Sequence, residues 1–412
     1  MDLFNVAALL ISFSALFAWL NQRTLRLPTT IGVMAIALLF SLGLLALGRF
    51  GLASPEWFAW FREVEFAPTL LDGMLGFLLF AGALHVDLGD LREQRWVVSF
   101  LATLGVLLST LLIAVASWGL FGAIGLQLPW VWCLAFGALI SPTDPIAVLA
   151  VLKQAGVPKS LETKIVGESL FNDGVGLVVF LVVVGAATTE GGFDPSAALG
   201  LLLQEAVGGV ALGLVLGSLA YGMLRTVDSP QVEVLITLAL VTGGYALAHA
   251  LHTSGPLAMV AAGLLIGNHG RRFAMSDATR DNLDTFWELV DEILNAVLFV
   301  MIGFELLLLD FTPARLVAGL LAIPLVLGAR TIAVGAGVSL LRIRRTFSPH
   351  AVKIMAWGGL RGGISVALAL QVPAGPEREV IVSITYTVVA FSILVQGLTL
   401  GPFVRRLYRN RA

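Results

Sequence analysis

Charged side chains are scarce in this sequence. Lys, Arg, Asp and Glu together make up 13% of its 412 residues, whereas 58% of the residues are hydrophobic. A soluble protein carries about 25% charged residues, which it needs to cover its surface. The composition therefore argues strongly against a soluble α/β enzyme and favours a protein that lives in a membrane.

Other features are missing as well. The single cysteine, Cys133, lies in an apolar stretch, so neither a disulfide framework nor a thiolate metal cluster is expected. The net charge of −2 gives no strong field that would attract nucleic acid. Residues 1–5 contain no basic region and no small-residue cleavage site, so we expect the first apolar stretch to be retained. The sequence predicts no cofactor and no nucleic-acid partner.

Long apolar stretches, by contrast, run from end to end. Stretches of about 20 residues are long enough to cross a hydrocarbon core of about 30 Å. They predict an all-α polytopic membrane protein with about thirteen transmembrane helices. The predicted spans are 3–21, 28–48, 67–86, 96–120, 130–152, 160–187, 197–224, 231–250, 255–268, 283–308, 313–340, 350–371 and 379–403. The polar, Trp- and Phe-rich segment 51–66 predicts an interfacial helix instead.

Basic residues are distributed unequally between the two sides of this topology. With thirteen spans and a cytoplasmic C-terminus, nineteen of the 25 Lys and Arg residues lie inside and four lie outside. Cytoplasmic loops carry such an excess of positive charge. The pattern predicts a multi-pass protein of the cell (inner) membrane with its N-terminus outside.

The fifth and twelfth spans contain sequence that interrupts a helix. Residues 141–145 read Ser-Pro-Thr-Asp-Pro, and residues 358–363 read Gly-Gly-Leu-Arg-Gly-Gly. Proline removes backbone donors and glycine weakens a helix. Broken backbone at membrane depth is tolerated where it lines a cavity or is buried in protein. A shift of seven spans maps helices 1–6 onto 8–13 in the opposite direction, which predicts inverted repeats with discontinuous helices 5 and 12.

The sixth span carries the densest polar cluster. Glu168, Ser169, Asn172 and Asp173 are three or four residues apart and lie on adjacent parts of one helix face. Ionisable residues inside a span are expensive and mark functional sites. Their oxygen atoms suit a small hard cation. A polar contact between helices is the alternative, which would explain a lone serine better than two acids in one span.

Asp144 is the second candidate. It lies between Thr143 and Pro145, where the backbone cannot form a regular helix, so the carbonyl of Thr143 is free to coordinate an ion. A simple turn at a span end is the alternative. About a dozen apolar residues precede Asp144 and more follow it, which favours a place within the membrane.

Two arginines within spans need acidic partners, because an unpaired buried charge is costly. Glu168 or another acid of its cluster is the expected partner of Arg361, in a structural or a tuning role. Arg330 is expected to pair with an acid near the tenth span. The candidate partners of Arg330 are Glu288, Asp291 and Glu292.

In order and placement, these motifs resemble those of the NhaP-type sodium/proton antiporters, which belong to the monovalent cation/proton antiporter superfamily. The resemblance rests on residues 141–145, 167–174 and 359–363 and covers essentially the whole chain. It implies that Asp173 alternately binds a cation and a proton. It also implies that Asp144, Thr143 and Ser169 complete the site for Na⁺ or Li⁺.

The resemblance implies further roles. Asn172 matches the asparagine of electroneutral members, and Glu168 with Arg361 matches a mainly structural ion pair. The family forms homodimers in which a six-helix core domain moves against a dimerisation domain. The expected division is 1–95 for dimerisation helices 1–3, 96–190 for core helices 4–6, 191–310 for helices 7–10 with linker and dimerisation roles, and 311–412 for core helices 11–13 with a short basic C-terminus.

The chain departs from the family pattern in the third span. Many relatives carry an acid where residues 79–83 read Leu-Phe-Ala-Gly-Ala, and the nearest acid in this span is Asp72. Ala81 in that position leaves an outer or water-mediated ligand missing.

The motifs predict cation/proton antiport in the service of pH homeostasis, with K⁺/H⁺ exchange through the same site as the alternative. An intramembrane aspartyl protease would also use two aspartates, but its chemistry does not need Ser169, Asn172 or Arg361. A channel would need a filter built by symmetry or by rings of carbonyls, which one carboxylate cluster does not supply.

Overall fold

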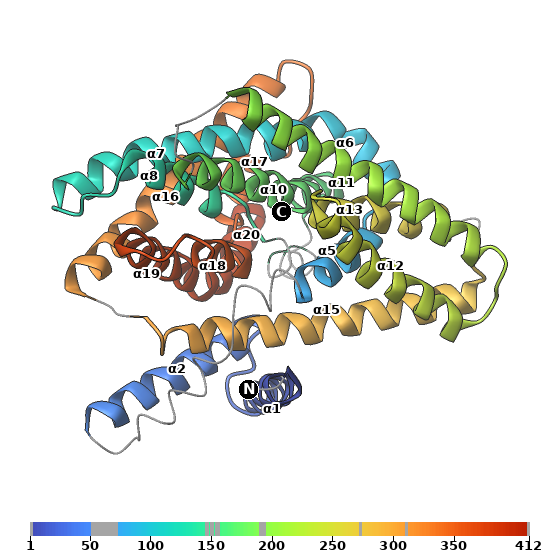
Figure 1. Ribbon diagram of the computed structural model, residues 1–412, viewed down its shortest axis with the longest axis horizontal. Helices are drawn as coiled ribbons and strands as arrows, with labels where there is room; N and C mark the ends of the chain where they lie inside the picture. The colour runs from blue at the N-terminus through green and yellow to red at the C-terminus, as the bar shows by residue number, and fades with distance from the viewer. Residues whose placement is uncertain are drawn as a thin grey trace.

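The computed structural model describes residues 3–50, 73–144, 148, 152, 157–188, 195–271, 274–309 and 312–409. Within these ranges the chain is almost entirely helical (Figure 1). The one β-bridge found there joins Asp144 and Leu360. The predicted all-α class is confirmed. The interfacial helix predicted at 51–66 lies outside the described residues.

The helices follow the predicted spans, and each span overlaps at least one of them. Among the described residues, eight helical stretches are long and apolar enough to cross a membrane, while the count of thirteen crossings stays a prediction. The elements are α1 (Leu3–Arg23), α2 (Thr29–Arg49), α5 (Leu75–Leu84), α6 (Leu88–Phe100), η2 (Leu101–Gly105), α7 (Val106–Ala123), α8 (Trp130–Ile140), α10 (Lys159–Thr188), α11 (Pro195–Leu224), α12 (Pro230–Ala250), α13 (Gly255–Leu265), η3 (Ile266–Gly270), α15 (Asp277–Glu305), α16 (Pro313–Leu341), α17 (Ala351–Trp357), α18 (Gly363–Leu370), α19 (Pro376–Phe391), η4 (Ser392–Gln396) and α20 (Gly397–Arg409).

The outer helices expose large apolar side chains. On α11, for example, Val207, Val215 and Leu219 are 61%, 58% and 63% exposed. A surface of this kind would aggregate in water but is suited to contact with lipid acyl chains. Together with the long apolar helices, it makes the chain a multi-pass membrane protein.

The helices pack in two groups. Helices α1, α2, α5, α11, α12, α13 and α15 contact one another, and α6, α7, α8, α10 and α16 to α20 form the other set of contacts. The long helix α15 has α1 and α2 on one side and α5 and α12 on the other (Figure 1). The two groups meet where α10 contacts α5, α11 and α13, and where α18 contacts α15.

Both predicted interruptions are present, and they meet. Helix α8 ends at Ile140, and residues 141–144 are not helical. The second break separates α17 from α18, between Trp357 and Gly363. The backbone N–H of Asp144 donates to the carbonyl of Leu360 at 2.8 Å, which joins the two breaks in an antiparallel bridge. The fold thus places the two irregular segments side by side, while the inverted repeat stays a prediction.

Close packing of α8 against α7 positions the first break. Gly137 on α8 faces the backbone of α7, and a Cβ atom at this position would overlap with the carbonyl oxygen of Thr110. The hydroxyl of Thr110 in turn donates to Ser141 Oγ at 3.3 Å, directly after the end of α8. The small residue therefore determines how near the break lies to its neighbouring helix.

We expect Gly137→Ala to destabilise the protein by about 1–3 kcal/mol, because the added methyl group has no room between two backbones. The measurement is the midpoint of thermal unfolding in detergent. Gly119→Ala on α7 is the control, since a Cβ atom there meets nothing within 4 Å. Equal midpoints for the two variants would contradict this account of the packing.

Candidate functional site

A small buried cavity lies at the crossing of the two broken segments. Its volume is about 60 Å³, and both Asp144 and Asp173 line it. No Lys or Arg is found among its lining residues within the described part of the chain. Its polar lining residues are Thr143, Asp144, Asp173, Asn295 and Ser365, and its apolar ones include Leu75, Leu78, Leu79, Pro142, Leu170, Leu298 and Ile364.

Helix α10 carries the acidic cluster into the protein interior. Asp173 is 7% exposed, and Glu168, Ser169 and Asn172 are still more buried. Because these residues are three or four positions apart, they face neighbouring structures rather than lipid. Asp173 reaches the cavity, whereas the other three contact the elements around it.

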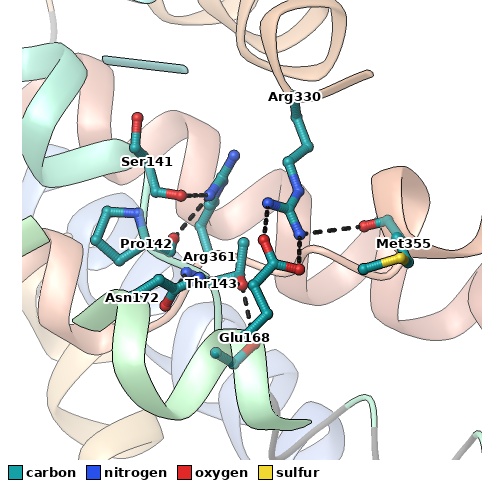
Figure 2. Close-up of polar contacts among 9 residues, drawn as sticks. Ser141, Pro142, Thr143, Glu168, Asn172, Arg330, Met355 and Arg361 are labelled. Carbon is teal, nitrogen blue, oxygen red and sulfur yellow. Dashed lines mark hydrogen bonds and ion pairs between the residues drawn. The ribbon is translucent and has the colours of Figure 1, made fainter. Parts of the chain in front are cut away.

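Thr143 is held by α10 through three contacts. Its N–H donates to Asn172 Oδ1 at 3.3 Å, and the Asn172 amide nitrogen donates to the Thr143 hydroxyl at 2.9 Å. The hydroxyls of Thr143 and Ser169 lie 2.9 Å apart. Figure 2 shows Asn172 beside Thr143 at the break. Three of the five predicted cation-binding residues line the cavity, and the other two, Ser169 and Asn172, hold Thr143 in place.

Arg361 does not form the expected ion pair with Glu168. Its Nη1 donates to the carbonyls of Ser141 and, at 2.7 Å, Pro142 (Figure 2). The physical reason lies in the break. In a regular helix the carbonyl of Ser141 would accept from the N–H of residue 145, but Pro145 has none. The guanidinium of Arg361 donates to these carbonyls instead. Arg361 therefore stabilises the backbone of the first broken segment.

Glu168 pairs with Arg330 instead, and this corrects both ion-pair predictions. Arg330 on α16 holds the carboxylate with two parallel hydrogen bonds, Nη1 to Oε1 and, at 3.0 Å, Nη2 to Oε2 (Figure 2). Both side chains are buried. Such a fork is the strongest arrangement for a guanidinium and a carboxylate. Arg330 is therefore not a partner of the acids on α15.

The ends of the broken helices face charges of the favourable sign. Arg361 lies at the carboxyl end of α8, where the helix dipole is negative. The carboxylate of Asp144 lies at the amino end of α18, where the dipole is positive. A Cβ atom on the capping residue Gly362 would be only 2.5 Å from Asp144 Oδ2, so glycine is needed for this approach.

Two polar residues at the cavity were missed by the sequence analysis. Asn295 on α15 and Ser365 on α18 both line the cavity and are almost fully buried. Ser365 follows the glycines of the second break, and Asn295 begins an apolar run. These positions in the sequence could have indicated the two residues. Neutral polar side chains are common in membrane spans, however, so they attract less notice there than acids do.

Comparison with known proteins agrees with this architecture. A family model described as "Sodium/hydrogen exchanger, transmembrane" matches residues 11–406. The chain is 51% identical to the Na⁺/H⁺ antiporter NhaP of Pseudomonas aeruginosa, over 99% of this chain and 97% of that protein. It is 37% identical to the Na⁺/H⁺ antiporter NhaH of Halobacillus aidingensis, over 83% and 84% of the two chains.

A solved structure has the same fold. The sodium proton antiporter MjNhaP1 of Methanocaldococcus jannaschii matches with a TM-score of 0.76 at 21% identity, covering 99% of each chain.

Broken helices that meet around buried carboxylates define a class of protein, the secondary transporters. Within that class, the chain belongs to the sodium/hydrogen exchanger family. The predicted family is confirmed, and the protein is a transporter rather than an enzyme.

We expect Glu168→Ala and Arg330→Ala each to destabilise the protein by about 3–5 kcal/mol, because either change leaves a buried charge without its partner. Replacing both residues by methionine should cost much less. Unfolding midpoints of the single and double variants measure the coupling. Arg315→Ala is the control, since Arg315 pairs with the exposed Glu379 and its loss should cost at most about 1 kcal/mol. Coupling of Glu168 to Arg361 instead of Arg330 would refute the assignment.

Proposed function

We propose that the protein exchanges Na⁺ for H⁺, and that the two compete for Asp173 with the help of Asp144. The observation that carries the proposal is the placement of both carboxylates on one buried cavity of about 60 Å³. Relatives of 51% and 37% identity bear the name Na⁺/H⁺ antiporter. The two carboxylates and the neighbouring Thr143 give this space oxygen ligands that suit a small cation.

In this proposal Asp173 and Asp144 are the charged ligands of the cation. Thr143 lines the cavity beside them and supplies neutral oxygens, and Ser169 supports it through the contact of 2.9 Å between the two hydroxyls. Asn172 acts by holding Thr143 in place. A hard monovalent cation such as Na⁺ or Li⁺ prefers such carboxylate, hydroxyl and carbonyl oxygens.

Competition between cation and proton follows from the proximity of two acids. Two carboxylates that share a small buried space repel each other, and either a cation or a proton relieves the repulsion. Their titrations are coupled, so the pair, and not one residue, sets the pH dependence. A proton on Asp173 removes the charge that the cation needs, which makes the two ligands mutually exclusive.

The charges around the crossing support a one-for-one, electroneutral exchange. Glu168 and Arg330 neutralise each other. Of Arg361 and the two cavity acids, Asp144 and Asp173, one negative charge remains when both acids are ionised. One monovalent cation or one proton balances it, and a buried site is least costly when neutral. Asn172, beside Asp173, adds no further charge.

Transport requires that the site open to each side in turn. We assign the group of helices with α10 and both broken segments to the moving core, corresponding to 96–190 and 311–412. The other group, corresponding to 1–95 and much of 191–310, would form the homodimer. The excess of basic residues on one side supports a protein of the inner membrane, in contact with its lipids, whose N-terminus is outside and whose C-terminus is in the cytoplasm.

Asp173→Asn should abolish exchange, because an amide of the same shape can neither balance a cation nor carry the proton. The measurement is proton flux in proteoliposomes with Na⁺, Li⁺ and K⁺ added in turn. Glu162→Gln, on the first turn of the same helix, is the control and should exchange normally. Substantial Na⁺-driven flux by Asp173→Asn would contradict the proposal. Flux of the unaltered protein with K⁺ alone would replace it by K⁺/H⁺ exchange.

Lowering the pH should raise the apparent KM for Na⁺ and leave the maximal rate unchanged. Below the pKa of the coupled acids, each pH unit should raise KM by up to about tenfold, because Na⁺ must displace a proton. The measurement is the Na⁺ dependence of initial exchange rates at several pH values. A KM that does not change with pH, while the maximal rate falls, would be evidence against competition.

A further inference from the structure

Asn295 is the polar side chain at the cavity whose role the proposed site leaves open. It lies on α15, is 1% exposed, and lines the cavity together with Asp144 and Asp173. Its amide nitrogen donates to the backbone carbonyl of Asp291, one turn earlier, at 2.8 Å. Its Oδ1 has no hydrogen-bond partner among the described residues.

The orientation of this amide follows from the hydrogen bond that its nitrogen donates to the backbone carbonyl of Asp291. If the amide were turned over, its oxygen would face the carbonyl oxygen of Asp291, and two acceptors would repel each other. The amide oxygen is therefore directed away from its own helix. A buried oxygen without a donor is costly unless a ligand or water completes it. Such an oxygen beside two cavity acids is available to a cation or to a water molecule that hydrates it.

Asp291 extends the same arrangement by one turn of α15. Its Oδ1 is buried and is also without a partner in the described part of the chain. Its carboxylate forms a side-chain hydrogen bond with Asn295 and interacts electrostatically with Asp144. Polar contacts between helices would leave these oxygens paired, as Asn268 is in this protein. The unpaired oxygens argue against a purely structural role.

Glu288 continues this row of acids to the surface. Residues 288, 291 and 295 are three or four positions apart, so they lie along one face of α15. Glu288 is 68% exposed in its side chain and is 3.8 Å from His85 Nε2 on the end of α5. Oxygen-bearing groups thus lead from the exposed part of α15 to the buried cavity.

We propose that Asn295 and Asp291 form an approach site on α15, where a partly hydrated monovalent cation is held before it passes to Asp144 and Asp173. The inference rests on the proposed cation exchange and deepens it. In the proposed orientation, the amino end of α15 faces the cytoplasm, so the approach site serves the cytoplasmic side. The two oxygens attract the cation before it reaches the cavity acids.

The test compares variants that remove or keep the ligand oxygen. Asn295→Leu has a similar size and no oxygen, Asn295→Asp keeps one, and Asp291→Asn removes the charge next to it. Glu292→Gln is the matched control, because Glu292 is the neighbouring acid on α15 but is exposed. Purified variants are reconstituted, and KM and maximal rate for Na⁺ are measured with Na⁺ added from the side that faces the amino end of α15.

Asn295→Leu and Asp291→Asn should raise the KM for Na⁺ by about three- to tenfold, the loss expected for one ligand, with the maximal rate nearly unchanged. Asn295→Asp should restore a low KM, and Glu292→Gln should behave as the unaltered protein. This split between KM and rate is not expected from damaged packing, which would lower the amount of active protein.

An unchanged KM in Asn295→Leu would overturn the proposal. A lower maximal rate of Asn295→Leu with an unchanged KM would also overturn it, because that result would show that Asn295 contributes to packing and not to cation binding. If Asn295→Leu does not fold, Asp291→Asn decides in the same way. Failure of the underlying function has a different result, because the unaltered protein would then show no Na⁺-driven proton flux at all.

Discussion

The crossing of two interrupted helices is the constraint on which the site depends. At membrane depth a broken helix leaves backbone groups without partners, and lipid cannot supply them. Each break here supplies what the other lacks: the carbonyl of Leu360 accepts from Asp144, and the side chain of Arg361 donates to Ser141 and Pro142. The glycines of the second break allow the close approach that this exchange requires. Without the crossing, the two aspartates would not share a cavity.

The two buried arginines have different partners. Arg330 neutralises Glu168 and ties α16 to α10 through a buried fork. Arg361 is occupied by backbone carbonyls at the end of α8. Consequently, Asp144 and Asp173 face the cavity with no basic side chain among its described lining residues. The negative charge that Arg361 does not offset is left for a mobile ligand, which is the physical condition for a site that takes up and releases a cation.

Much of this arrangement could be predicted from the sequence, and the failures have a common origin. Asp173 and Asp144 were found because acids inside apolar stretches are conspicuous. Both breaks were found because proline and glycine act locally. The partners of Arg330 and Arg361 were assigned wrongly, because a partner depends on which helices are neighbours. Asn295 was missed because a neutral amide becomes notable only when its oxygen is seen to lack a donor.

The sequence by itself determined that this protein is helical, crosses the membrane repeatedly, breaks two of its helices and buries acids beside one break. These properties follow from composition and from local rules of backbone chemistry. Only the tertiary structure decided which charges are paired and which remain at the cavity. Pairing energies depend on distances of a few ångströms between segments more than a hundred residues apart, such as Glu168 and Arg330, and no local pattern encodes them.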